Sequence, residues 1–310
     1  MEVVLLNFAI GLVVLLFSTQ KLVALAEKIS RKFRVSPLIV GITVVAIGTS
    51  LPELTVSVIS ILKNDSGLAM GNIIGSNIVN ILMVFPVGLL LGNLRIGTTK
   101  TQKNALILLG VTALFFLSRY TGEFRKIFGI SLIGLSVLVS YIEYQFAVSG
   151  RLHEDLKQFK KDHKEKLSSF SYLIGLFLIV GIIAGGILVV NSIEGISLLT
   201  GISTTVLGLT LSAVATSLPE LLTTIFSQKD HQEKITIGNV IGSNIYNLLL
   251  IGGIVSLFPL TKVVSVSEWL WLGVTTLAFV FIIKFYKGSR PPKFIGLLLL
   301  LFFFIYIFTQ

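Results

Sequence analysis

The sequence predicts an all-α polytopic membrane protein with ten transmembrane helices arranged as two inverted five-helix repeats. Hydrophobic residues make up 54% of the 310-residue chain and charged residues only 13%, far from the balance of a soluble domain. Apolar stretches suited to a hydrocarbon core of ~30 Å recur ten times from end to end, which favours helices over barrel strands. Two long motifs also recur at one fixed spacing.

The repeat defines the expected organisation. GITVVAIGTSLPE at 41–53 recurs as GLTLSAVATSLPE at 208–220, and GNIIGSNIVN at 71–80 recurs as GNVIGSNIYN at 238–247. Both pairs are 167 positions apart, and about twenty positions are identical between 36–80 and 203–247. Five helices per repeat give the halves opposite orientations in the membrane, with sites expected near the midplane. We therefore expect a first repeat at 1–148, a connector at 149–169 and a second repeat at 170–310.

The ten helices are expected in the following order. The first covers about 3–26, the second follows Ser36-Pro37 and ends at Lys63 to Asp65, and the third opens with the motif at Gly71. The next three cover about 105–117, 127–146 and 172–190, the last of them ending in NSIEG. The seventh carries the second long motif, the eighth opens at Gly238, and the last two cover about 269–283 and 294–308.

Each long motif places a carboxylate inside an apolar helix. An acidic side chain near the middle of a bilayer costs several kcal/mol, so an intramembrane Glu53 or Glu220 indicates a functional site with a partner. Because the repeats are inverted, each glutamate is the expected partner of the other.

A proline in each long motif leaves a backbone carbonyl without its helical hydrogen bond. Pro52 and Pro219 lack an N–H, so the carbonyl four residues earlier loses its helical donor. Free carbonyls at membrane depth need protein, water or a ligand as a partner. Together with neighbouring hydroxyls, each break offers carbonyl, hydroxyl and carboxylate oxygens, which is a ligand set for a hard cation. The hydroxyls are those of Thr49, Ser50, Thr216 and Ser217.

The third helix carries four polar side chains in an apolar setting. Small-residue packing between helices explains the glycines of the motif. We interpret Ser76 and Asn80 as ion-lining, and Asn72 and Asn77 as packing residues.

Basic residues predict the topology. Of the 25 Lys and Arg residues, 19 lie in alternate loops that begin after the first helix, and five lie in the loops between them. By the positive-inside rule the first set is cytoplasmic, which places the 149–169 connector in the cytoplasm and both termini outside. The net charge of +10 therefore indicates topology in the plasma membrane and no nucleic-acid partner. The absence of cysteine excludes disulfides and thiolate sites.

GTSLPE with GNIIGSNIVN, and ATSLPE with GNVIGSNIYN, resemble the two α-repeats of sodium/calcium exchangers in the cation/calcium exchanger superfamily. The resemblance covers essentially the whole chain. It implies antiport of Ca²⁺ for Na⁺ by alternating access, with three Na⁺ competing with one Ca²⁺ around two glutamates. These ions are substrates, so we expect no cofactor and no enzyme activity, and we expect a monomer in the lipid bilayer.

The resemblance also assigns roles to residues. It implies that Glu53 and Glu220 are the carboxylates shared by Ca²⁺ and Na⁺, and that the carbonyls of Thr49 and Thr216 complete the Ca²⁺ cage. Asn80 and Asn247 would face the central position. The Na⁺ positions on either side would be lined by Ser50, Ser76, Ser217 and Ser243 and by the carbonyls of Ala46 and Ala213. Where potassium-dependent relatives have aspartate, this chain has Asn247, which argues against K⁺ co-transport.

Three alternatives remain open. A Ca²⁺/H⁺ or other divalent cation/H⁺ antiporter could use buried glutamates as proton carriers. A cation channel could use the two carboxylates as a selectivity ring. An intramembrane hydrolase would need a water-activating acid pair and a substrate gate, which an inverted repeat does not predict.

Overall fold

The computed structural model describes residues 1–32, 46–92, 94, 96, 99–149, 169–229, 233–261 and 264–310. The described residues form helices and no strand. Ten helical segments follow one another in them: α1 (Glu2–Lys32); α3 and α4 (Ala46–Thr49, Leu51–Leu62); α5, η2 and α6 (Ser66–Val79, Asn80–Val84, Phe85–Leu91); α7 (Thr99–Phe116); α8 (Arg125–Ser149); α10 (Ser169–Thr200); α11, η5, α12 and α13 (Thr204–Leu207, Gly208–Ser212, Ala213–Thr216, Leu218–Lys229); α14, η6 and α15 (Glu233–Tyr246, Asn247–Ile251, Gly252–Val255); α16 (Val266–Phe285); and α17 (Lys293–Thr309).

The predicted all-helical membrane fold is confirmed. Seven of the described segments are long and apolar enough to cross a membrane, while α4, the apolar part of α7, and α17 are shorter apolar helices. Residues 33–45, where we expected the second helix to begin, lie outside the described residues, as does the connector from 150 to 168.

Several predicted helix ends were wrong. The sixth helix does not end in NSIEG, because α10 continues through this stretch to Thr200. The third and eighth helices begin five residues before their glycine motifs, at Ser66 and Glu233. In α5 the earlier start follows from an N-cap: the backbone N–H of Leu68 donates to the Asp65 carboxylate at 3.1 Å.

The structural elements repeat at the spacing of the motifs. Moved by 167 positions, the bounds of α3, α4, α5 and η2 coincide with those of α12, α13, α14 and η6. Each repeat therefore breaks its motif helix at the same serine and opens one π-helical turn at the same asparagine.

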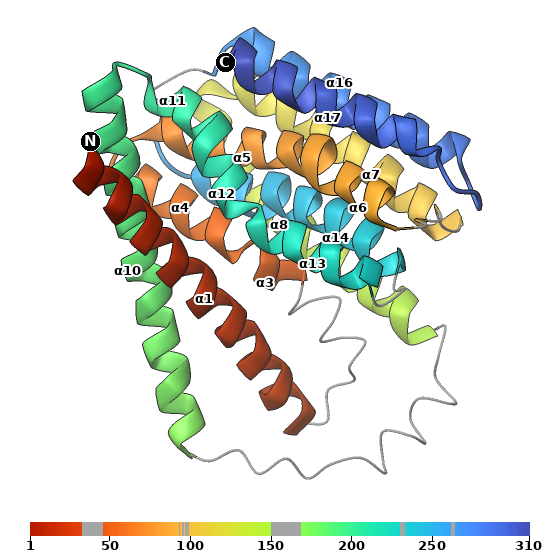
Figure 1. The fold of residues 1–310 in the computed structure, drawn as a ribbon, viewed down its shortest axis with the longest axis horizontal. Coiled ribbons are helices and arrows are strands. Elements are labelled where there is room, and N and C mark those ends of the chain that lie inside the picture. The colour runs from red at the N-terminus through yellow and green to blue at the C-terminus, as the bar shows by residue number, and fades with distance from the viewer. Residues whose placement is uncertain are drawn as a thin grey trace.

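The helices α1 and α10 lie side by side at one edge of the molecule, while α16 and α17 lie at the opposite edge (Figure 1). Glycines allow the close approach of α1 to α10. A methyl group on Gly185 would lie 2.6 Å from the backbone nitrogen of Leu15, and one on Gly11 would lie 2.7 Å from Cβ of Leu188. The first and sixth helices of the chain therefore form one paired unit.

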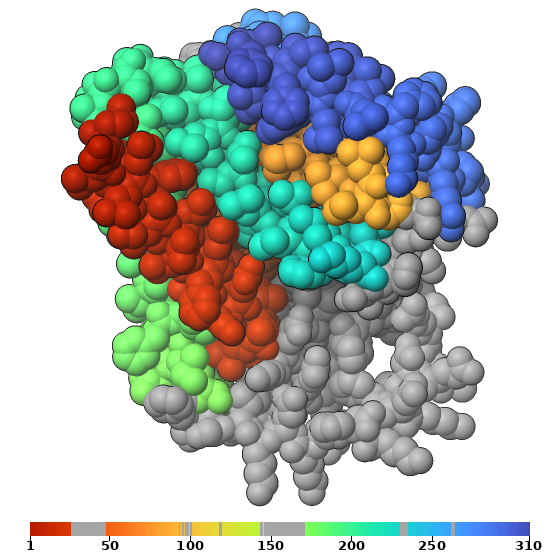
Figure 2. All heavy atoms as spheres, viewed as in Figure 1, coloured from red at the N-terminus to blue at the C-terminus, as the bar shows by residue number. Residues whose placement is uncertain are grey.

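Between these edges, the two motif helices of one repeat pack on those of the other. The backbone of α5 meets η5 closely, since a methyl group on Gly208 would lie 2.8 Å from the carbonyl oxygen of Leu68. On the face shown in Figure 2, α11 to α13 lie between α1 and α17. The buried aliphatic and aromatic core surrounds these central helices and includes an edge-to-face pair of Phe85 and Phe279, whose ring centroids are 4.9 Å apart.

One link joins the α1/α10 unit to the central helices at the end of α4. The Lys63 ammonium donates to Asn191 Oδ1 at 2.7 Å and to Glu194 Oε2 at 2.5 Å, and both partners are on α10. This pairing explains why Asn191 and Glu194 do not end the helix: their polar side chains have a partner on α4.

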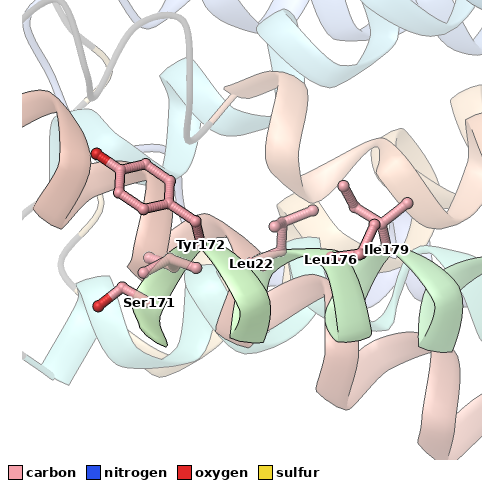
Figure 3. Close-up of a pocket in the computed structure, with 7 residues that line it drawn as sticks. Leu22, Ser171, Tyr172, Leu176 and Ile179 are labelled. Atoms are coloured by element: carbon pink, nitrogen blue, oxygen red, sulfur yellow. The ribbon is translucent and has the colours of Figure 1, made fainter. Parts of the chain in front are cut away.

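An apolar pocket of about 330 Å³ lies between the other ends of α1 and α10 (Figure 3). In this view, Leu22, Leu176 and Ile179 line one side of the pocket, and Ser171 and Tyr172 lie at the other side. Its lining lacks carboxylates and amides, so this pocket is distinct from the polar centre described next.

Candidate cation site

The site is built on two helix breaks that are related by the repeat. Ser50 interrupts α3 and α4 with φ −88° and ψ 7°, and Ser217 interrupts α12 and α13 with φ −81° and ψ 6°. Pro52 and Pro219 are each the second residue of the following helix, where no backbone donor is required. Each break therefore places a glutamate in the first turn of a new helix, at the positive end of its dipole.

Both glutamates are completely buried. Ser217 Oγ donates to Glu53 Oε1 at 3.4 Å. The second oxygen of Glu53 and both oxygens of Glu220 accept no hydrogen bond, although Thr49 and Ser243 are polar neighbours of Glu220. Two buried acids with three unpartnered oxygens require cations or protons, since a buried charge without a partner costs several kcal/mol.

Hydroxyl groups from both repeats adjoin the carboxylates. Thr49 Oγ1 and Ser243 Oγ are 3.4 Å apart, and Thr216 Oγ1 and Ser76 Oγ are also 3.4 Å apart. Each pair joins the broken helix of one repeat to the glycine-motif helix of the other. Ser50 Oγ is buried and has no hydrogen-bond partner.

Two amides stand at equivalent positions, the first residue of the π-helical turns η2 and η6. Asn80 Nδ2 donates to Asn244 Oδ1 at 3.0 Å, and its own Oδ1 is unpartnered. Asn247 is fully buried, and neither atom of its amide has a partner. Single π-helical turns are frequent at functional sites because they disturb the helical register.

The structure thus buries the predicted carboxylates, hydroxyls and amides together in the central helices. Among the described residues, no three His, Cys, Asp or Glu side chains gather into a metal cluster. The arrangement is instead two carboxylates supplemented by neutral oxygens, which suits hard cations.

Backbone carbonyls were also among the predicted ligands. The carbonyl of Ala213 accepts from the backbone N–H of Ser217 at 3.1 Å, and that of Ala46, the first residue of α3, occupies the equivalent place in the chain. Ligation of cations by these two carbonyls, and by those of Thr49 and Thr216, stays a prediction.

Some polar residues of the centre were not predicted. Asn244 bridges the repeats: it accepts from Asn80 and donates to the carbonyl of Asn77 at 3.2 Å. Ser212 is fully buried and donates to Asn72 Oδ1 at 2.7 Å. Asn244 could have been found from the motif SN, which both repeats share, whereas Ser212 has Val45 as its repeat counterpart and carries no such signal.

A family model described as sodium/calcium exchanger protein matches residues 3–145 and 170–310. The chain belongs to the sodium/calcium exchanger family. Among curated members, it is 30% identical to the sodium/calcium exchanger MaX1 of Methanosarcina acetivorans, with 96% of each chain covered. It is 32% identical to the inner membrane protein YrbG of Escherichia coli, with 80% of this chain and 78% of that protein covered.

The solved structures give the same family. The sodium-calcium exchanger NCX_Mj, soaked with 2.5 mM Na⁺ and 0.1 mM Sr²⁺, superposes with a TM-score of 0.65 at 29% identity and 99% coverage of both chains. The same exchanger soaked without Na⁺ and Ca²⁺ superposes with a TM-score of 0.62. The predicted family and its ten-helix membrane fold are confirmed.

Proposed function

We propose that this protein is a secondary active antiporter that exchanges Na⁺ for Ca²⁺ across the membrane. The observation that supports this most is the completely buried pair Glu53 and Glu220, with three carboxylate oxygens that accept no hydrogen bond. Neutral hydroxyl and amide oxygens surround the pair. Two carboxylates among neutral oxygens carry a formal charge of −2, which either one divalent ion or several monovalent ions can neutralise.

Formal charge predicts the electrical behaviour. One Ca²⁺ neutralises the two carboxylates, whereas three Na⁺ exceed their charge by one. With the stoichiometry implied by the family resemblance, each cycle moves one positive charge in the direction of Na⁺, so exchange responds to voltage. Asparagine at both 80 and 247 adds no further charge, which supports exchange without K⁺.

Alternating access needs an element that moves against the site. We propose that the α1/α10 unit is this element, because the two helices pack on each other through glycines and contact the central helices through α4 and α3. Cysteines introduced along α1 and α10 are then expected to change thiol accessibility between Na⁺ and Ca²⁺ conditions. We also propose a plasma-membrane location with both termini outside.

The decisive measurement is ⁴⁵Ca²⁺ uptake into proteoliposomes of the purified protein under imposed Na⁺, H⁺ or K⁺ gradients. We expect uptake to follow an outward Na⁺ gradient, to change with an imposed voltage and to ignore K⁺. Uptake that follows only the H⁺ gradient would assign Ca²⁺/H⁺ exchange. Flux without any counter-ion would assign a channel. Glu53→Gln in identical vesicles is the control for leak.

One substitution tests the role given to Asn247. Asn247→Asp adds a titratable carboxyl group to the centre, so exchange by the variant should decline as the medium becomes mildly acidic and protons compete with cations. The unmodified protein, which lacks this added carboxyl group, should decline less over the same interval. An absolute K⁺ requirement of the unmodified protein would contradict the assignment.

A further inference from the structure

Asn72, on α5, makes every hydrogen bond that its amide can make. Its Nδ2 donates to the carbonyl oxygen of Glu53 at 3.2 Å and to Ser57 Oγ at 3.0 Å. Its Oδ1 accepts from Ser212 Oγ at 2.7 Å and from Thr216 Oγ1 at 3.3 Å. The side chain is completely buried. One amide therefore connects the carboxylate helix of the first repeat to the broken helix of the second.

Asn239 repeats this connection with the repeats exchanged. Its Nδ2 donates to the carbonyl oxygen of Glu220 at 3.2 Å, and its Oδ1 accepts from Thr49 Oγ1 at 3.4 Å. Asn239 stands 167 positions after Asn72, so the two contacts are equivalent under the repeat. Each asparagine thus holds the main chain of one glutamate and the threonine of the opposite break.

The direction of these hydrogen bonds matters for cation binding. An amide oxygen only accepts, so Thr216 must donate its single proton to Asn72 when the two bond. The Thr216 oxygen is then an acceptor toward Ser76 Oγ, 3.4 Å away, and Ser76 donates its proton to it. The lone pairs of Ser76 are left for a cation. The same sequence of donations runs from Ser243 through Thr49 to Asn239.

We infer that Asn72 and Asn239 are positioning residues that turn the hydroxyl protons of the site away from the cation. The inference rests on the proposed function and extends it, since neither asparagine is itself a ligand. A serine or threonine hydroxyl binds a cation through its oxygen only when its proton points elsewhere. Each asparagine therefore converts one Thr–Ser pair into cation acceptors, and it revises the packing role that the sequence indicated for Asn72.

Asn77 provides a matched control on the same helix. It is 1% exposed, and its Nδ2 donates at 2.8 Å to the carbonyl of Ile73, one turn earlier in α5. It makes no side-chain contact with a hydroxyl of the site in the described structure. A leucine of similar volume at 72 or at 77 therefore removes an equally buried amide, but only one of the two orders Thr216 and Ser76.

The test measures the increase in unfolding temperature that saturating Na⁺ gives to the full-length protein in detergent, and the Na⁺ concentration at half-effect, because Ser76 and Ser243 are the predicted lining of the Na⁺ positions. Asn72→Leu should raise that concentration roughly tenfold, the factor expected for the loss of a hydrogen bond between buried groups. Asn77→Leu should leave it unchanged. A Na⁺ response of Asn72→Leu equal to that of the unmodified protein would overturn the inference.

A double-mutant cycle separates proton direction from general packing. If Asn72 acts through Ser76, Asn72→Leu should weaken Na⁺ binding strongly in the unmodified protein and little in a Ser76→Ala background. Equal losses in both backgrounds would show that Asn72 only packs. If Asn72→Leu does not fold, Asn239→Leu with Ser243→Ala gives the same cycle. Absence of any Na⁺ response in the unmodified protein would instead contradict the proposed function.

Discussion

The two repeats share their backbone but not the hydrogen bonding of their site residues. In the first repeat, Glu53 accepts from Ser217 and Asn80 donates to Asn244. In the second repeat, both oxygens of Glu220 and both amide atoms of Asn247 are buried without a partner. Unpartnered polar atoms occur in both repeats but on different atoms, since the first repeat leaves Ser50 Oγ, Glu53 Oε2 and Asn80 Oδ1 without a partner.

This difference shows that the repeat preserves the backbone conformation but not the hydrogen-bond partners of the side chains. The helix breaks and π-helical turns occur at equivalent positions, so the backbone presents the same types of side chain from both repeats: threonine, two serines, glutamate and asparagine. Whether each side chain has a protein partner depends on its neighbours, which differ. Both repeats thus leave carboxylate and amide oxygens without a protein partner for the transported ions.

The largest effect is expected at the two glutamates, which carry the same charge in both repeats. Glu53→Gln and Glu220→Gln each remove one of two negative charges that oppose a divalent ion, and a neutral amide does not replace it. Either change should abolish Ca²⁺ exchange in proteoliposomes while the purified variant keeps the helical circular dichroism of the unmodified protein. Normal exchange by either folded variant would refute the assignment of the site.

Substitutions of Asn80 and Asn247 should distinguish the two repeats. Asn80→Ala and Asn247→Ala delete the same atoms from fully buried positions, but only the first leaves a partner, Asn244 Oδ1, without its donor. Without ions, Asn80→Ala should therefore lower the free energy of unfolding by about 1–3 kcal/mol more than Asn247→Ala.

Denaturation of the two asparagine variants in ion-free detergent measures this difference. Their Ca²⁺-induced stabilisation should not show this difference, because Oδ1 of both Asn80 and Asn247 accepts no hydrogen bond. Equal free energies of unfolding for the two variants in ion-free detergent would remove the asymmetry between the repeats.

A smaller effect is expected at the π-helical turn η5. The Tyr306 hydroxyl on α17 donates to the carbonyl oxygen of Leu209 at 2.9 Å, and the corresponding residue of the first repeat is Val139. Tyr306→Phe removes this one hydrogen bond and should cost about 1 kcal/mol of unfolding free energy. Val139→Ala, measured in the same thermal scans, reports packing alone. No loss in Tyr306→Phe would mean that the second repeat does not depend on this donor.

The smallest effect concerns the link between α4 and α10. Lys63 and Glu194 are about one-third exposed, and such pairs contribute roughly 0.2–1 kcal/mol. Their repeat counterparts, Asp230 and Glu27, are both acidic and lack the opposite charges of an ion pair. Lys63→Gln should therefore shift the balance between access states by less than about fivefold, favouring the state without the contact.

Thiol labelling of a cysteine placed on α10 measures that balance, with Lys63→Arg as the control that keeps the charge. If both variants label alike, the ion pair does not bias the exchanger.

The sequence alone predicted the ten helices, the inverted repeat and the residues of the centre, because a fixed spacing and intramembrane carboxylates are local signals. It did not predict where polar residues find distant partners. Asn191 and Glu194 were interpreted as the end of a helix, yet Lys63 lets the helix continue past them. Asn72 was interpreted as packing because its partners at Ser212 and Thr216 lie about 140 positions away.

The π-helical turns also record the history of the chain. A π-helical turn is equivalent to one residue inserted into an α-helix, and η2 and η6 carry that insertion at the same repeat position, Asn80 and Asn247. Independent insertions would have had to choose the same place in both halves. The insertion is therefore older than the gene duplication, and the ancestral five-helix unit already had its asparagine at a widened turn.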